Sequence, residues 1–256
     1  MPSRVLFSAL GAIALGMMAP AAAQANHSWN GYHWARTSNP FTLKLGDNVT
    51  SAWDASLTGA SSDWSRSSVL DTTVVAGSTR PKNCRPTAGR VEVCNAAYGS
   101  TGWLGIASIS VTGGTHITQG TVKLNDTYFN TAQYNTPAWR NLVTCQEVGH
   151  TFGLAHQDEN FNNANLGTCM DYTNDPSTNQ HPNQHDYDQL VSIYAHTDST
   201  TTVGADLPSG ASAASAGNDE RSWGRLVEGS RAEGHSTHVR DLGNGNLIVT
   251  TVTWAR

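Results

Sequence analysis

The chain has 256 residues and a formal net charge of −5 at pH 7. This length is enough for one domain of good size together with a small appendage. Charged residues make up only 14% of the chain, against about 25% in an average soluble domain. The sequence carries no basic footprint of the kind that binds nucleic acid, so we expect no nucleic-acid partner.

The N-terminus has the pattern of a secretory signal peptide, which we assign to residues 1–25. Arg4 supplies the positive charge, residues 5–18 are largely apolar, and Ala23-Gln24-Ala25 offers a cleavage site. The apolar stretch is too short to span a bilayer stably, and no second apolar run follows it. We therefore predict a secreted or periplasmic protein without a membrane span.

Hydrophobic periodicity predicts a series of strands followed by helices. Strands are expected at residues 40–45, 70–76, 90–97, 102–111 and 115–124. Asn48 could cap an intervening helix, and Pro137 opens a second helix at an accepted position for proline. A third, amphipathic helix is marked by Tyr187, Leu190, Val191 and Tyr194.

The C-terminal part of the chain changes character. Residues 198–220 are rich in Thr, Ser, Gly and Ala, which predicts a flexible linker. Three later stretches alternate like strands, at residues 223–227, 235–242 and 247–254, with a favourable hairpin turn at Asn244-Gly245. Three strands are marginal alone, so we expect this small C-terminal β region, residues 221–256, to pack on the preceding domain or on a partner.

The most informative pattern of the chain is E-x-x-H-x-x-G-x-x-H, formed by Glu147, His150, Gly153 and His156. On a helix, Gln146 and His150 lie one turn apart on the same face and could both reach one metal ion. Glu147 would lie beside that ion, where a general base for a water molecule belongs. Gly153 tolerates the left-handed backbone that ends a helix, so His156 can approach the ion from another direction.

This pattern resembles the metzincin zinc endopeptidases, whose signature is H-E-x-x-H-x-x-G-x-x-H followed by a Met-turn. The layout is most similar to a bacterial matrixin-like metalloprotease, with Cys-Met-Asp-Tyr at residues 169–172 as the Met-turn. The resemblance implies an α+β fold over residues 32–197. We expect a twisted, mostly parallel sheet, an active-site helix, a Met-turn and a C-terminal helix, with the C-terminal β-hairpin region added.

The resemblance also implies roles for individual residues. His150 and His156 would bind Zn²⁺, and Glu147 would polarise the water. Met170 would lie under the metal, and Tyr172 would contact the metal or the oxyanion of the transition state.

The chain departs from the family at the first ligand position, where Gln146 replaces histidine. An amide oxygen is a weaker zinc ligand than imidazole or thiolate. Three readings follow: Gln146 binds through its oxygen, or Tyr172, Asp158 or His185 completes the ligand set, or the site is inactive. We favour an active site because the base Glu147 is retained.

Two further family features concern the substrate and a second metal. In metzincins an edge strand pairs with the extended substrate backbone, and residues 104–111 are our candidate for that strand. Matrixins also carry a structural zinc and calcium loop, and its spacing is not found here, because His116 and Asp126 stand alone.

Four cysteines in an exported chain predict two disulfides. Three connectivities are possible. We favour Cys84–Cys94, which closes a short loop, and Cys145–Cys169, which would tie the active-site helix to the Met-turn. Metal ligation by cysteine is the alternative, although the pairs lack the close spacing of a Cys zinc site.

Together, these features predict a secreted Zn²⁺-dependent endopeptidase that acts on protein or peptide substrates. Glu147 would take a proton from the attacking water and pass it to the leaving amine. Two other classes stay open: a catalytically degenerate extracellular zinc-binding or inhibitory module, and an adhesion or carbohydrate-binding protein that uses its tryptophans.

Overall fold

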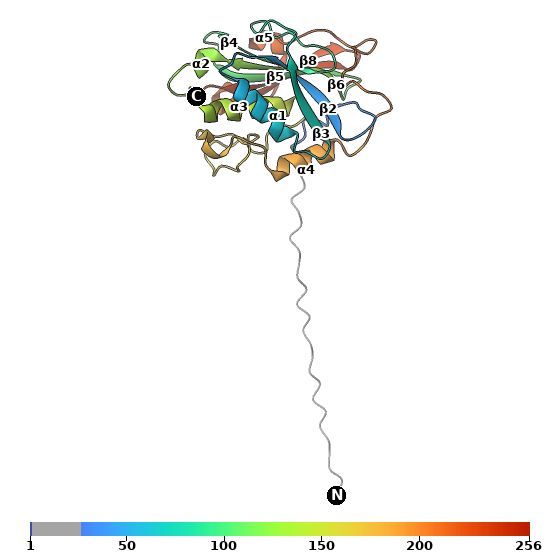
Figure 1. Cartoon of the computed structure of the whole chain (residues 1–256), viewed down its shortest axis with the longest axis horizontal. Helices are drawn as coiled ribbons and strands as arrows, with labels where there is room; N and C mark the ends of the chain where they lie inside the picture. Colours follow the sequence, from blue (N-terminus) through green and yellow to red (C-terminus); the bar gives the residue numbers. More distant parts are fainter. Residues whose placement is uncertain (2–26) are drawn as a thin grey trace.

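The computed structural model describes Met1 and residues 27–256 of the chain. Within that part, the strands form one mixed sheet of nine strands with helices packed against it (Figure 1). The predicted signal peptide lies outside the described residues except for Met1. Among the helices that are described, none is both long and apolar enough to cross a membrane.

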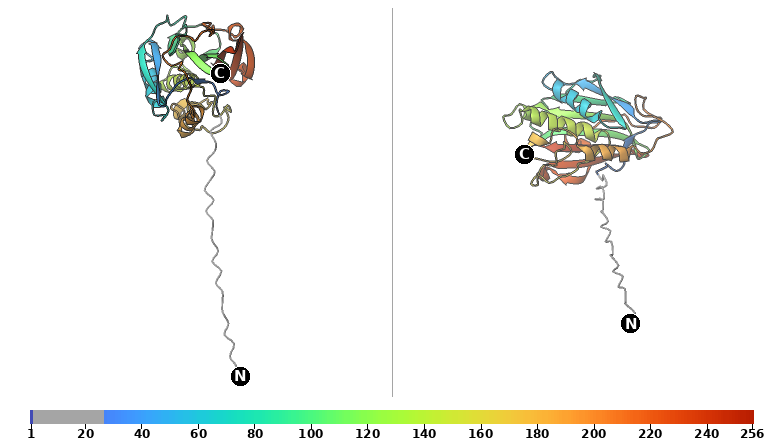
Figure 2. Two further views of the ribbon diagram at one scale, coloured as in Figure 1. Left: turned by 90° about the vertical axis from the view of Figure 1, so that its right-hand side faces the viewer. Right: turned by 60° about the horizontal axis from the view of Figure 1, so that its bottom comes forward.

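The strands follow the order β3-β2-β4-β6-β5-β9-β8-β7, and β1 pairs with one end of β6. In chain order they are β1 (His33–Trp34), β2 (Phe41–Asn48), β3 (Leu70–Ala76), β4 (Val91–Ala96), β5 (Trp103–Thr112), β6 (His116–Asn125), β7 (Arg225–Ser230), β8 (His235–Gly243) and β9 (Asn246–Trp254). Strands β1 to β4 and β6 pair in parallel, whereas β5, β9, β8 and β7 extend the sheet in antiparallel pairs. Figure 2 shows β2 and β3 (blue to teal) at one end of the sheet and the C-terminal strands (red) at the other.

The helices of the described region are α1 (Asp54–Trp64), α2 (Asp126–Phe129), α3 (Pro137–His150), α4 (Gln184–Ile193) and α5 (Glu220–Trp223), with short 3-10 turns at Pro176–Thr178 and Arg231–Glu233. Helix α3 begins at the predicted proline, Pro137. Thr136 caps it by accepting a hydrogen bond from the N–H of Trp139. The predicted cap Asn48 instead ends β2 and donates to Glu92 at 2.6 Å, so helix α1 starts later in the chain.

The predicted metzincin-like fold, with a mostly parallel sheet and an added C-terminal hairpin region, is wrong. The sheet is mixed, its antiparallel pairs are on the whole the longer ones, and the described chain has more strand than helix. Strand β9 pairs with β5 from Val111↔Leu247 to Trp103↔Trp254. Three strands alone are marginal. Continuing the sheet gives the C-terminal strands partners and removes the exposed edge that β5 would otherwise present.

Apolar side chains are buried in two clusters. The larger cluster joins the sheet to helices α1, α3 and α4 and includes Trp34, Trp53, Trp64, Phe152 and Tyr194. The smaller cluster lies beside α5 and comprises Trp103, Ile106, Ala216, Trp223, Ile248, Val252 and Trp254. Alternating residues of β5 and β9 enter different clusters, as expected of strands buried on both faces.

The segment predicted as a linker contains no helix or strand over residues 198–219. It nevertheless contacts the sheet through Lys123 of β6. The ammonium group donates to the carbonyl oxygens of Ala216 and Gly217 at 3.0 Å each and to Asn218 Oδ1 at 2.8 Å. Burial lowers the pKa of Lys123 to about 8.

Both predicted disulfides are confirmed. Cys84 pairs with Cys94, and Cys145 pairs with Cys169. The second bridge joins helix α3 to the predicted Met-turn. Paired cysteines are compatible with an extracellular protein, and they leave no cysteine for metal ligation in the described chain.

Candidate metal and catalytic site

Helix α3 carries the motif on its buried second half. Gly149 allows this packing, since a Cβ atom there would lie 2.6 Å from the Trp64 ring and 2.8 Å from Met170 Sδ. The helix ends at His150, and the chain then bends at Gly153, which has a φ of +93°. A Cβ atom at Gly153 would lie 1.9 Å from Tyr32 O, so both the backbone angle and the close approach require glycine.

The bend brings His150 and His156 together. Their ring centroids are 4.5 Å apart, and the rings are nearly perpendicular. Nδ1 of His150 donates to the carbonyl of Leu154 at 2.8 Å, which leaves the lone pair on Nε2. That Nε2 atom is buried and has no hydrogen-bond partner among the described residues. Burial, reinforced by His156, lowers the pKa of His150 well below its usual value and keeps the ring neutral.

His156 is oriented from both of its nitrogens. Nδ1 lies 3.1 Å from Glu159 Oε1, and Nε2 lies 2.8 Å from the Tyr172 hydroxyl. Burial lowers the pKa of His156 despite the neighbouring carboxylate, so the neutral ring donates from Nδ1 and accepts at Nε2. Glu159 also meets His235 Nε2 at 3.0 Å. Hydrogen bonds from His156 and His235 hold the pKa of Glu159 well below its usual range.

Tyr172 is therefore the third-ligand candidate that the structure brings to the histidines. Its ring also stacks on His235, with centroids 4.9 Å apart. The other two candidates have different partners. His185 stacks on His27 at 4.8 Å. Asp158 lines the same groove as His156, but its Oδ1 atom accepts from the N–H of Asn160 at 2.6 Å.

Glu147 and Gln146 meet at strand β9. Thr253 Oγ1 lies 2.7 Å from Glu147 Oε1 and 2.9 Å from Gln146 Oε1. The other end of the Gln146 amide donates to Cys169 O at 2.9 Å. Both polar atoms of Gln146 are therefore engaged within the protein, and its oxygen faces Thr253.

The carboxyl of Glu147 is completely buried. Its Oε2 atom has no hydrogen-bond partner in the described region, and a Cβ atom at Gly105 would lie 2.5 Å from Oε1. Burial raises the pKa of Glu147 to about 8, although the hydrogen bond from Thr253 works in the opposite direction. The group is thus a buried acid whose protonation can change near neutral pH, as a proton-transfer residue requires.

Two hollows adjoin the motif. A small cavity of about 70 Å³ touches Gln146, Tyr172 and Thr253. A wider groove of about 500 Å³ reaches His156 and Glu159. Glu147 lines neither of these two hollows.

The predicted substrate-binding edge is wrong. Residues 104–111 lie in β5, which is paired with β6 on one side and β9 on the other. Strands β3 and β7 end the sheet instead. In this arrangement β9 takes the position at which an extended peptide would add to β5.

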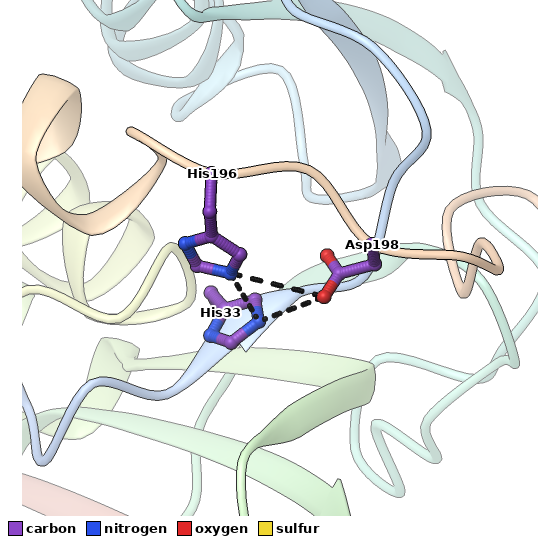
Figure 3. Close-up of side chains that lie close together, drawn as sticks. All are labelled: His33, His196 and Asp198. Carbon is purple, nitrogen blue, oxygen red and sulfur yellow. Dashed lines mark hydrogen bonds and ion pairs between the residues drawn. The ribbon is translucent and has the colours of Figure 1, made fainter.

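A second group of side chains converges away from helix α3. His33, His196 and Asp198 place one potential ligand atom each within 4.8 Å of the others, so this group could hold a metal ion (Figure 3). His116, which stands alone in the sequence, lies against the same carboxylate at 3.3 Å. The sequence alone does not predict this group, because most of its members are far apart along the chain. Only His196 and Asp198, two residues apart, are close enough in sequence to suggest a shared ligand site.

Comparison with known proteins identifies no family for this chain. No protein-family model matches it, and no curated protein matches it in sequence. The metzincin resemblance therefore stays a hypothesis that depends on the motif residues and on the geometry around His150 and His156.

Proposed function

We propose that the protein is a secreted or periplasmic Zn²⁺-dependent endopeptidase, described here in a closed form. The observation that carries the proposal is the buried, unpartnered Nε2 atom of His150, beside the ring of His156. A buried nitrogen lone pair without a partner is costly unless it binds something. Zinc favours imidazole nitrogen, so the donor chemistry fits this ion.

The surroundings of the two rings fit metal ligation as well. Metal-binding histidines usually donate their other ring N–H to a carbonyl or a carboxylate. His150 does so to Leu154 O, and His156 does so to Glu159. His150 thereby keeps a free Nε2 lone pair for an ion. The Nε2 lone pair of His156 accepts from the Tyr172 hydroxyl, and an ion would take the place of that hydrogen bond.

We propose Tyr172 as the third ligand in place of Gln146. The Tyr172 hydroxyl lies 2.8 Å from His156 Nε2, at hydrogen-bond distance, so a small outward shift would let both atoms bind one ion. The Gln146 oxygen faces Thr253 Oγ1 at 2.9 Å, and its nitrogen donates to Cys169. Gln146 would then orient the end of helix α3 rather than contact the metal.

The chemistry follows from what the ion supplies and what Glu147 does. When bound, zinc polarises a peptide carbonyl and lowers the pKa of a water molecule. Glu147 takes a proton from the water while the water oxygen attacks the carbonyl carbon of the peptide. Glu147 then gives that proton to the amine nitrogen as the C–N bond breaks. The nearby positive charge would favour the carboxylate form that this first step needs.

Access to Glu147 requires a change at β9. The carboxyl is completely buried, and Thr253 of β9 holds one of its oxygens. A peptide could reach the base only after the C-terminal strands move away from β5. We therefore interpret β7, β8 and β9 as a segment that keeps most molecules closed and lowers the activity without abolishing it.

The same burial favours one second candidate, a zinc-binding module without catalysis. If β9 always covers Glu147, a substrate cannot reach this carboxyl, and the protein would bind zinc without catalysing hydrolysis. The carbohydrate-binding alternative has less support, because Trp53, Trp64, Trp103 and Trp223 are buried in the two cores.

Hydrolysis of a denatured, unstructured protein separates the two candidates. We expect cleavage that depends on zinc and stops with a chelator. Glu147→Gln should lower the rate by at least about 10²-fold, the usual scale of acid–base catalysis, while zinc binding persists. Glu220→Gln is the matched control, since Glu220 is exposed on α5. Zinc binding without cleavage by the wild-type protein, even at high enzyme concentration, would select the non-catalytic module.

A further inference from the structure

The second group of histidines joins three segments that are distant in sequence. His33 lies in β1, His116 begins β6, and His196 and Asp198 follow helix α4. Figure 3 shows the rings of His33 and His196 turned toward the carboxylate of Asp198. Side chains from separate segments thus share one small volume at the surface, in which His33 is buried and His196 is half exposed.

The distances fit a shared ion. His196 Nε2 lies 3.1 Å from His33 Nε2, and Asp198 Oδ1 lies 3.6 Å from His33 Nε2 and 3.8 Å from His196 Nε2. Ligand atoms around a tetrahedral zinc ion, each about 2.0–2.1 Å from the metal, lie about 3.3 Å apart. His116 Nε2 is 3.3 Å from the same Asp198 oxygen.

Two of the proposed ligands, His33 and Asp198, are each oriented by a partner outside the group. His33 donates from Nδ1 to Gly31 O at 2.8 Å, which leaves its Nε2 lone pair facing the group. Asp198 accepts at Oδ2 from the side chain of Arg36 at 2.9 Å and from its backbone N–H at 3.1 Å. Oδ1 is therefore the oxygen left for the histidines. Such outer contacts are the usual support of metal ligands.

Without an ion, hydrogen bonds can connect the group. Because His33 uses its proton at Nδ1, its Nε2 lone pair faces the carboxylate oxygen Oδ1 of Asp198. His196 can donate to that nitrogen, and His116 can donate to that oxygen. A cation would be attracted by the carboxylate and could accept the lone pairs of all three rings at once.

We propose that His33, His196 and Asp198 bind a structural zinc ion, with His116 as the fourth ligand. Four protein ligands make a closed site without a position for water, so the ion would stabilise rather than catalyse. Three imidazoles and one carboxylate suit zinc better than the hard ions Ca²⁺ and Mg²⁺.

The proposed zinc site would also stabilise the bend at Gly153 that brings His150 and His156 together. Trp34, next to His33, donates from Nε1 to Thr151 O at 2.9 Å. Tyr194, two residues before His196, donates to Phe152 O at 2.9 Å. An ion that joins the segments of Trp34 and Tyr194 would therefore hold the backbone between His150 and His156 from two sides.

Zinc titration of the purified, metal-free protein tests this site. We expect the wild-type protein to bind one more equivalent of zinc than Asp198→Asn or His196→Ala. His116→Ala should keep the stoichiometry and weaken binding at this site by at least about tenfold. His181→Ala is the control, because His181 is exposed and pairs with Asp63, and it should match the wild type.

A second measurement separates this site from the one at helix α3. In a His150→Ala background, zinc should raise the melting temperature, and the rise should disappear when Asp198→Asn is added. Melting in chelator shows that each variant folds, and Asp198→Asn preserves the size of the side chain. The proposed site would be rejected if Asp198→Asn changed neither the zinc stoichiometry nor the zinc-dependent shift in melting temperature. Unchanged affinity in His116→Ala would remove His116 from the ligand set.

Discussion

The hydroxyl of Thr253 lies 2.7 Å from Glu147 Oε1 and joins β9, the last strand in the chain, to the candidate base. The same hydroxyl is 2.9 Å from Gln146 Oε1. The hydroxyl of Thr253 has one hydrogen, which it can donate to one acceptor at a time. Thr253 therefore donates either to Glu147 or to Gln146. The C-terminal strand is thereby a part of the site and the element that covers it.

Replacing Thr253 tests whether this contact keeps the protein closed. Thr253→Val keeps the shape of the side chain and removes its hydrogen bond, which is worth about 1 kcal/mol. The open form should then be populated several-fold more, and hydrolysis should accelerate by up to about tenfold. The rate is measured with a denatured protein substrate. Thr253→Ser retains the hydroxyl and should behave as wild type, whereas a slower Thr253→Val variant would mean that Thr253 supports catalysis instead.

Locking β9 onto β5 tests the same closure from the opposite side. Ser108 and Thr250 are cross-strand partners, and their hydroxyl oxygens lie 2.9 Å apart. The double variant Ser108→Cys/Thr250→Cys places two thiols at this buried position, where oxidation can join them in a disulfide. The oxidised protein should no longer hydrolyse the substrate, and mild reduction should restore the activity. The single Ser108→Cys variant and reductant-treated wild type are the controls. Full activity of the verified, oxidised double variant would show that β9 stays in place during catalysis.

Glu92 predicts a pH dependence of stability far from the candidate site. Burial alone would raise its pKa, but hydrogen bonds from Ser78 and Asn48 and the contact with Arg90 outweigh burial and hold the pKa below its usual value. The charged form therefore stabilises the fold above the unfolded pKa, and this contribution is lost as the pH falls through the folded pKa.

Glu92→Gln should thus lower the free energy of unfolding at pH 7 by about 1.5–3 kcal/mol, because the hydrogen bonds from Ser78, Asn48 and Arg90 lose their charged acceptor. In urea titrations the difference from wild type should shrink as the pH falls below about 4. Glu220→Gln should show little difference at either pH. A Glu92→Gln deficit that stays constant down to pH 3 would contradict the lowered pKa.

The parts of the molecule that sequence reasoning predicted depend on local rules. Pro137 starts helix α3 because proline fits the first turn, and Gly153 bends the chain because only glycine tolerates both its φ and the contact with Tyr32. The pairing of Cys84 with Cys94 follows from the short loop between them, and it leaves Cys145 to pair with Cys169.

The remaining features depend on how distant segments pair. An alternating pattern near Trp254 suits an independent hairpin and a strand on a larger sheet equally well, so its pairing with Trp103 had no local signal. Thr253 becomes a partner of Glu147 only through that pairing. His116 likewise gains its neighbours when β1 and the segment after α4 pack against β6.

The central claim is that one zinc ion lies between two imidazole rings at the end of helix α3. Anomalous diffraction at the zinc absorption edge, from crystals of the zinc-loaded protein, measures this directly. We expect a peak about 2.0–2.1 Å from Nε2 of both His150 and His156. Zinc-loaded crystals in which no peak lies near these two atoms, or in which the two nitrogens point to different places, would contradict the account.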